Sequence, residues 1–167
     1  MKNFIHKIAV PLFLMTCLLV GCNNDDDSLQ LMDEEEFLTA KVDGVDLFVQ
    51  GMEGIISCEK YVTHTGSTDI LFKVGTVSDE SIEFRISNYI GNNFYSLGSS
   101  SFQNSWIKYR QGDGEWLNVK GNSQDIIEII EDDGNYLTGR FSFQGHNQTD
   151  LSRKLISEGN FRVKIDF

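Results

Sequence analysis

The sequence predicts an all-β domain from three observations. Apolar and polar residues alternate with a period of two in several segments, Asp-Gly pairs stand between such segments, and the single proline, Pro11, lies close to the N-terminus. We therefore expect an antiparallel β-sandwich of about 8 to 10 strands, with a small lipocalin-like β-barrel as the alternative.

The clearest alternation marks three strands. Ile82, Phe84 and Ile86 alternate with polar neighbours, and the same pattern runs through 137–144 and 161–167. One apolar and one polar face per strand suits an antiparallel sheet that covers a core on one side. Weaker strand patterns lie at 37–42, 45–50, 54–62, 70–77, 106–110, 116–119 and 126–131, and 150–157 is either a short helix or a strand.

Turn-forming pairs separate the predicted strands. Asp43-Gly44, Asp113-Gly114 and Asp133-Gly134 readily supply the positive φ angles of tight hairpins. Asn122-Ser123 and Glu158-Gly159 are weaker signals of the same kind. We expect a turn at each of these positions.

The N-terminal residues have the pattern of a secretion signal. Lys2 and Lys7 make a positive start, and the apolar run 8–20 follows. This run fits the apolar region of a signal peptide and is too short to cross a bilayer comfortably. It ends in Leu19-Val20-Gly21-Cys22.

This ending resembles the lipobox of bacterial lipoproteins. The resemblance implies that residues 1–21 are a signal peptide, that the chain is cut before Cys22, and that Cys22 carries lipid. The alternative is an ordinary signal peptide that a cysteine happens to follow. Acyl chains contribute about 0.8 kcal/mol per buried methylene, so several chains would hold the protein firmly on a membrane.

Residues 22–36 form a predicted acidic linker. Asp25-Asp26-Asp27 and Asp33-Glu34-Glu35-Glu36 carry like charges that repel one another and stay solvated, which favours a flexible spacer. An acidic run just after a lipidated cysteine also resembles the export signal of Bacteroidetes-type surface lipoproteins. We expect the outer membrane, with the cell surface and the periplasmic face both left open.

The remaining residues, 37–167, suffice for one domain. Removal of Lys2 and Lys7 with the signal lowers the formal net charge from −11 to −13. So acidic a chain repels nucleic acid, and we expect no nucleic-acid partner. Cys58 is then the one cysteine besides Cys22, so we expect no internal disulfide and a buried, inert thiol.

Four segments in order resemble a known group of proteins. They are 37–44 (Phe-Leu-Thr-Ala-Lys-Val-Asp-Gly), 91–98 (Gly-Asn-Asn-Phe-Tyr-Ser-Leu-Gly), 137–143 (Leu-Thr-Gly-Arg-Phe-Ser-Phe) and 158–161 (Glu-Gly-Asn-Phe). The chain resembles small Bacteroidetes-type lipoproteins classed as a domain of unknown function. The resemblance implies a lipid-anchored β-domain with no known activity, and it supplies no catalytic or binding residues. Region 51–80 matches little beyond strand character.

Few residues suggest metal or cofactor chemistry. Outside the signal, His64 and His146 stand in polar, loop-like context, and a zinc site would need three or four closely spaced ligands. Asp132 and Asp133 lie in an acidic cluster that is either a weak Ca²⁺ site or a solvated hairpin tip. We expect no cofactor.

Three aromatic residues are candidates for ligand binding. Trp106, Tyr109 and Trp116 flank the turn at 111–115. On the inner face of a hairpin they would belong to the core, and on the outer face they would form a platform for sugar or protein contacts.

Together these observations favour a non-catalytic envelope lipoprotein. Its β-domain would bind a glycan, a peptide or an envelope protein while a lipid holds it to the membrane. The main alternative is a lipocalin-like small-molecule carrier, which needs an interior cavity lined by Phe and Ile. The third is a small glycan-active hydrolase, which needs converging carboxylates of perturbed pKa.

Overall fold

The computed structural model describes residues 36–51, 54–76, 78–98 and 104–166. The predicted signal peptide, Cys22 and almost all of the linker lie outside these residues. The all-β prediction is confirmed, with eleven strands in the described part of the chain. They are β1 (Phe37–Val42), β2 (Val45–Gln50), β3 (Gly54–Val62), β4 (Thr68–Thr76), β5 (Glu80–Ile86), β6 (Asn93–Ser96), β7 (Trp106–Gln111), β8 (Gly114–Asn118), β9 (Ile126–Asp132), β10 (Tyr136–His146) and β11 (Arg153–Lys164).

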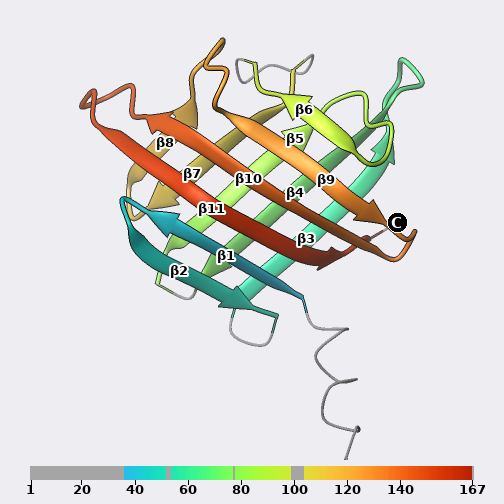
Figure 1. The fold of residues 1–167 in the computed structure, drawn as a ribbon, viewed down its shortest axis with the longest axis horizontal. Helices are drawn as coiled ribbons and strands as arrows, with labels where there is room; N and C mark the ends of the chain where they lie inside the picture. The colour runs from blue at the N-terminus through green and yellow to red at the C-terminus, as the bar shows by residue number, and fades with distance from the viewer. Residues whose placement is uncertain (1–35, 52–53, 77, 99–103, 167) are drawn as a thin grey trace, which may run out of the picture.

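The strands form two layers whose directions cross (Figure 1). One layer has the order β2-β1-β11-β10-β9-β6, and the other has the order β3-β4-β5-β7-β8. Neighbours within each layer are antiparallel. Period-two alternation turns the apolar side chains of both layers toward a shared interior.

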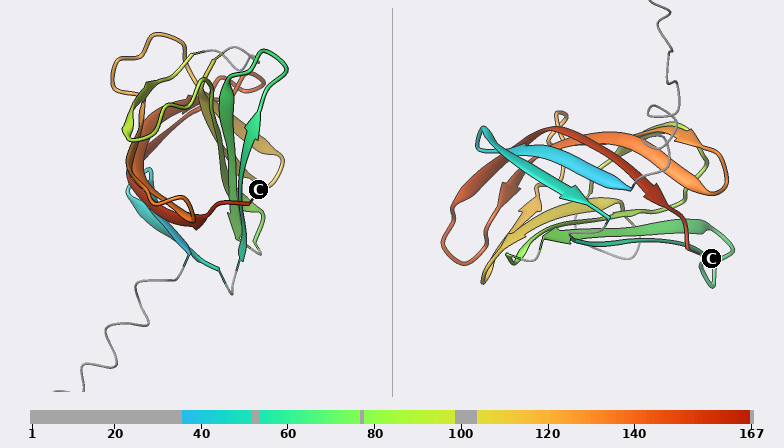
Figure 2. Two further views of the ribbon diagram at one scale, coloured as in Figure 1. Left: turned by 90° about the vertical axis from the view of Figure 1, so that its right-hand side faces the viewer. Right: turned by 90° about the horizontal axis from the view of Figure 1, so that it is seen from below.

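The two layers join on both sides into an almost closed barrel (Figure 2). On one side the end of β10 leaves β9 and pairs with β8, through Gly145↔Asn118 and His146↔Leu117. On the other side Asp166, just after β11, donates its N–H to the Cys58 carbonyl of β3 at 2.7 Å, and its own carbonyl accepts from the Lys60 N–H at 3.3 Å. The architecture therefore lies between the predicted sandwich and the predicted barrel.

Most strand predictions agree with the structure, and the differences are local. β6 is not among the predicted strands, because its four residues are too few to show a clear alternation. The β7–β8 turn is Gly112-Asp113, one residue before the predicted pair, because Gly112 supplies the positive φ of 54°. The range 150–157 is no helix: β11 begins at Arg153.

The predicted turn at Glu158-Gly159 is a β-bulge inside β11. Glu158 has a φ of 52°, and one extra β11 residue is inserted against both neighbouring strands at this point. A bulge of this kind bends a strand and increases its twist. The turn-like sequence thus curves β11 around the core and does not end it.

The interior is filled by phenylalanine rings from both layers. Phe72 and Phe84 stack at 4.2 Å between centroids, and Phe161 lies 5.1 Å and 5.3 Å from them. Phe141 completes the cluster at 6.4 Å from Phe84. Contacts of this kind contribute about 0.5–1.5 kcal/mol per pair beyond the burial of area.

Two glycines on β10 and β11 make room for these rings. Gly139 lies opposite Phe161 and Gly159 opposite Phe141 in the same ladder, so each ring lies across a glycine of the next strand. A Cβ on Gly159 would lie 2.6 Å from the Phe141 ring, and one on Gly139 would overlap the Glu128 carbonyl oxygen. Neither position has space for a side chain.

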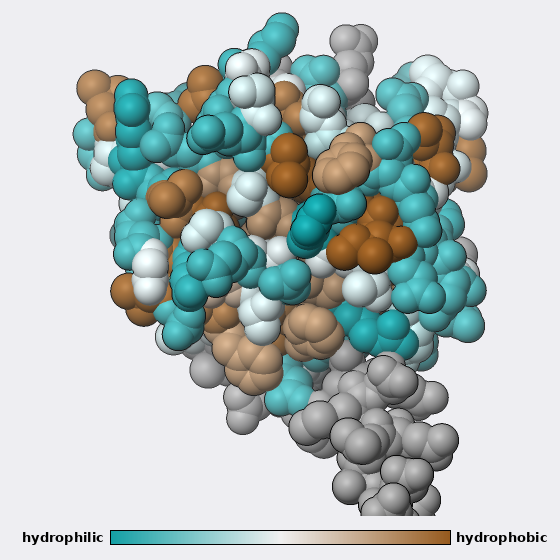
Figure 3. Space-filling view, in the orientation of Figure 1, coloured by the Kyte–Doolittle hydropathy of each residue, from teal (hydrophilic) through white to brown (hydrophobic). Residues whose placement is uncertain are grey.

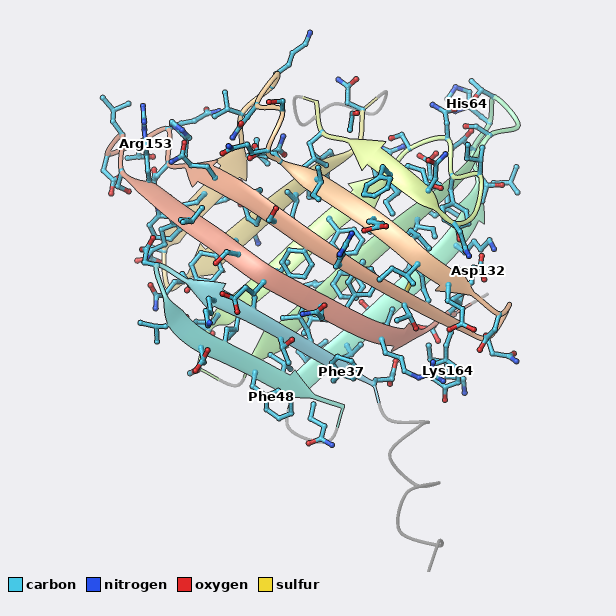
Figure 4. All side chains as sticks on the ribbon, viewed as in Figure 1. Phe37, Phe48, His64, Asp132, Arg153 and Lys164 are labelled. Atoms are coloured by element: carbon cyan, nitrogen blue, oxygen red, sulfur yellow. The ribbon has the colours of Figure 1, made fainter. Side chains whose placement is uncertain are left out.

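The face formed by β9, β10 and β11 is mainly hydrophilic, with separate apolar patches (Figure 3). Phe37 and Phe48 lie together at its lower end, where the described chain begins (Figure 4). Within the described ranges, no helix has the length and apolar character needed to cross a membrane.

We predict that Gly139→Ala lowers the free energy of unfolding by about 1–3 kcal/mol, since the new methyl group overpacks the β9–β10 ladder. Denaturant unfolding of the full-length protein measures this. The control is Gly75→Ala, because a Cβ there meets its nearest neighbours at an ordinary 3.4 Å. Equal free energies of unfolding for the two variants would contradict the claim that position 139 has no space for a side chain.

Candidate functional site

The three predicted aromatic residues separate onto two faces of the β7–β8 hairpin. Tyr109 and Trp116 are buried cross-strand partners with ring centroids 5.7 Å apart. Trp106 lies on the outer face, half-buried, with the Lys108 ammonium 5.1 Å from its ring. The structure therefore does not gather the three rings into one exposed platform.

Cys58, His64 and His146 lie in three different environments. Cys58 is a free, fully buried thiol, and burial raises its pKa to about 12. Such a thiol holds its proton at neutral pH, which suits a packing role. His64 is exposed in the β3–β4 loop, as expected, whereas His146 is half-buried at the end of β10 and not in a loop.

The acidic pair of the β9–β10 turn serves the fold. Asp132 accepts hydrogen bonds from Tyr89 Oη at 2.7 Å and Lys60 Nζ at 2.9 Å. Burial opposes the charge of Asp132, but these two bonds, the Gly134 N–H and the Lys60 charge together hold its pKa below the ordinary value. Asp133 accepts the N–H groups of Asn135 and Tyr136, both at 2.7 Å. In the described ranges, no three His, Cys, Asp or Glu residues group as a metal site would require.

A pocket of about 570 Å³ opens between the β3–β4 hairpin and the end of β5. This volume falls within the roughly 300–1,000 Å³ of small-molecule sites. Figure 4 shows His64 in the hairpin loop at the upper right. The pocket is lined by Tyr61, Val62, Thr63, His64, Thr65, Ser67, Asp69, Arg85, Ser87 and Asn88.

A buried ion pair forms part of the pocket lining. Asp69 and Arg85 are only 2% and 7% exposed, and Arg85 Nε donates to Asp69 Oδ2 at 3.0 Å while Nη2 donates to the same oxygen. Asp69 Oδ1 accepts the N–H of Asn88 at 3.0 Å. Removing one partner of such a pair costs about 3–5 kcal/mol, since a buried charge is left alone. This lining is therefore rigid and electrically balanced.

Hydroxyl groups line the other side of the pocket. Thr63 Oγ1 lies 2.8 Å from both Thr65 Oγ1 and Ser67 Oγ, and the last two lie 3.4 Å apart. Ser87 Oγ is buried and has no hydrogen-bond partner among the described residues. An unpaired buried hydroxyl is unfavourable, and a bound group that donates or accepts a hydrogen bond would satisfy it.

Sequence reasoning does not single out this pocket. Its lining comes from 61–69 and 85–88, which only the β3-β4-β5 register brings together: Tyr61 lies opposite Asp69, and Ile70 opposite Ile86. The one available signal is the strand-flanked run Thr63-His64-Thr65-Gly66-Ser67, which reads as an ordinary polar loop.

Two further pockets lie away from this site. One, of about 560 Å³, is lined by polar residues of the β7–β8 turn and the β10–β11 loop, including Asp113, Glu115, His146 and Asp150. The other, of about 320 Å³, adjoins Asp125. Asp125 is 3% exposed; its Oδ1 accepts from Asn122 Nδ2 at 2.6 Å and Gln144 N–H at 2.9 Å, and its Oδ2 has no partner in the described part of the chain.

Comparisons of the chain with protein-family models, with curated proteins and with solved structures found no match. The site therefore has to be judged from its own geometry.

We predict that Asp125→Asn stabilises the protein at about pH 7 and that this gain shrinks toward about pH 4. Burial raises the pKa of Asp125 above its ordinary value. A carboxyl with a raised folded-state pKa contributes stability below its unfolded pKa and loses that contribution as pH rises through the folded pKa. Asparagine keeps an acceptor oxygen and removes the charge.

Denaturant unfolding at several pH values measures this difference. Asp113→Asn, in the exposed β7–β8 turn, is the control. A gain that is independent of pH, or one that grows on acidification, would refute the prediction.

Proposed function

We propose that the protein is a non-catalytic envelope lipoprotein whose β-domain binds a ligand in the pocket between the β3–β4 hairpin and β5. Lipid on Cys22 would hold it to the outer membrane, as the lipobox-like Leu19-Val20-Gly21-Cys22 and the acidic linker suggest. The resemblance of four sequence segments to small Bacteroidetes-type lipoproteins also supports this proposal. The observation that carries the binding role is the pocket itself, with its rigid lining and unpaired hydroxyl.

The packed interior favours a surface site over a carrier cavity. A carrier needs open space among the Phe and Ile side chains of the core. At the centre of this barrel, Phe72, Phe84 and Phe161 are in ring contact with one another. The space for a ligand lies outside, where the hairpin overhangs the end of β5.

The pocket lining favours binding over hydrolysis. Glycoside hydrolysis uses two carboxylates that face each other across the substrate. Among the described residues that line this pocket, Asp69 is the only carboxylate, and its two oxygens accept hydrogen bonds from Arg85 and from the Asn88 N–H. A carboxylate held in this way is poorly suited to transfer protons.

The point where the described chain begins also supports display of the pocket. The described chain begins beside Phe37 at the lower end of the molecule, whereas His64 lies at the opposite, upper end (Figure 4). The left view of Figure 2 also shows the β3–β4 hairpin at the upper end and the start of β1 at the lower end. A domain held by residues 22–36 would therefore present the pocket away from its attachment point.

We predict that small fragments bind at this pocket. A library of polar and aromatic fragments is screened against the full-length protein by NMR, and amide shifts of 61–69 and 85–88 are compared with those of 146–150, which line another pocket. Clustered shifts in the first set are expected. Absence of any fragment response there would refute the binding role.

We predict that Cys22 carries the lipid anchor. Cells grown with labelled palmitate should label the wild-type protein and Cys58→Ala, the matched control, but not Cys22→Ala. Protease treatment of intact cells then separates the two locations: loss of the domain places it on the surface, and survival until the outer membrane is broken places it in the periplasm. Labelling of Cys22→Ala would disprove the anchor.

A further inference from the structure

We propose that the ligand of the pocket between the β3–β4 hairpin and β5 is a neutral saccharide, bound through one sugar ring. This inference rests on the proposed binding function and specifies the chemical class of the ligand. Three properties of the lining support it: its charge balance, the number and kind of its hydrogen-bonding groups, and its aromatic edge.

The charge balance of the pocket disfavours an ionic ligand. Of the described residues that line it, Asp69, Arg85 and His64 are the ionisable ones besides Tyr61, and Asp69 and Arg85 pair with each other. A ligand anion would meet an Arg85 already bonded to Asp69, inside a strongly acidic protein. A ligand cation would meet an Asp69 whose two oxygens already accept bonds. Neither charge finds a free counter-ion among the lining residues.

The hydrogen-bonding groups suit a ligand with several hydroxyls. A hydroxyl has one proton and two acceptor lone pairs. If Thr63, Thr65 and Ser67 each donate to the next, their three short contacts use all three protons and leave one lone pair on each oxygen. Ser87 Oγ needs a partner that either donates or accepts. Sugar hydroxyls do both, so they match the remaining acceptors of the loop and the unpaired serine in chemical kind.

An aromatic side chain supplies the apolar contact. Tyr61 lines the pocket and is 37% exposed, and the neighbouring Val62 also lines it. The C–H face of a pyranose is apolar and packs on aromatic rings, while its hydroxyl edge requires polar groups. The pocket offers both kinds of surface within one small-molecule volume.

A peptide fits these observations less well. Extended peptides are held mainly by main-chain pairing along an exposed strand edge. The groups that distinguish this pocket are side-chain hydroxyls and an aromatic ring, which surround a compact volume at a hairpin end. Peptide binding is therefore an alternative outcome of the test.

The test is saturation-transfer NMR and calorimetry on the full-length protein in a detergent without a sugar headgroup, since a glycoside detergent would compete. The probes are methyl glucoside, methyl galactoside and methyl mannoside, with glucuronate and glucosamine as charged counterparts and a pool of short peptides. We expect binding of at least one neutral glycoside and weaker binding of both charged sugars.

Paired variants assign that binding to the pocket. Tyr61→Ala should weaken binding roughly tenfold, whereas Tyr61→Phe retains the ring and should retain the affinity. Phe48→Ala, which removes an exposed ring elsewhere, should leave the affinity unchanged. Ser87→Ala should also weaken binding without loss of thermal stability, because the hydroxyl has no partner to lose. Its matched control is Thr138→Val, which removes another buried, unpartnered hydroxyl on β10.

Each outcome has a defined meaning. Neutral glycoside binding that depends on Tyr61 and Ser87 supports the proposal. Preference for glucuronate or glucosamine, binding of peptides instead, or sugar binding that is unchanged in Tyr61→Ala and Ser87→Ala overturns it. If fragments bind in the pocket and no sugar does, the saccharide assignment fails while the binding function stands. If neither binds, both fail.

Discussion

The fold depends on one packing constraint: where β10 and β11 pair, two phenylalanine rings pack directly on glycine backbone of the neighbouring strand. Gly139 faces Phe161 and Gly159 faces Phe141, so both rings reach the centre of the barrel and contact rings of the opposite layer. The bulge at Glu158 bends β11 at the same place. Without that bend and those two glycines, the layers would not approach closely enough to share one core.

The architecture is predictable from the sequence where local chemistry decides it. Period-two alternation marks strands such as β5 and β10, and Asp43-Gly44 forms the expected tight turn, with φ angles of 50° and 83°. The prediction fails where tertiary context decides. Glu158-Gly159 has the composition of a turn, but pairing on both sides of β11 keeps it within a strand, because the ladders outweigh a local preference.

The candidate site is less predictable, for a physical reason. Asp69 and Arg85 look like surface charges in the sequence, and only the β4–β5 ladder brings them into one buried pair. The predicted aromatic set divides because adjacent strand positions face opposite sides, which places Tyr109 inside and Trp106 outside. Sequence patterns specify the face of a strand; they do not specify which side chains of distant strands meet.

The Asp69–Arg85 pair also constrains how such a protein can diverge. A single substitution at either position leaves the other charge buried without its partner. The two positions are therefore expected to change together or to stay fixed. The loop above them, Thr63 to Ser67, carries no comparable penalty because its residues are exposed or half-buried and hold no buried charge. The loop sequence can therefore vary among descendants of one ancestor while the buried pair beneath it is kept as a unit.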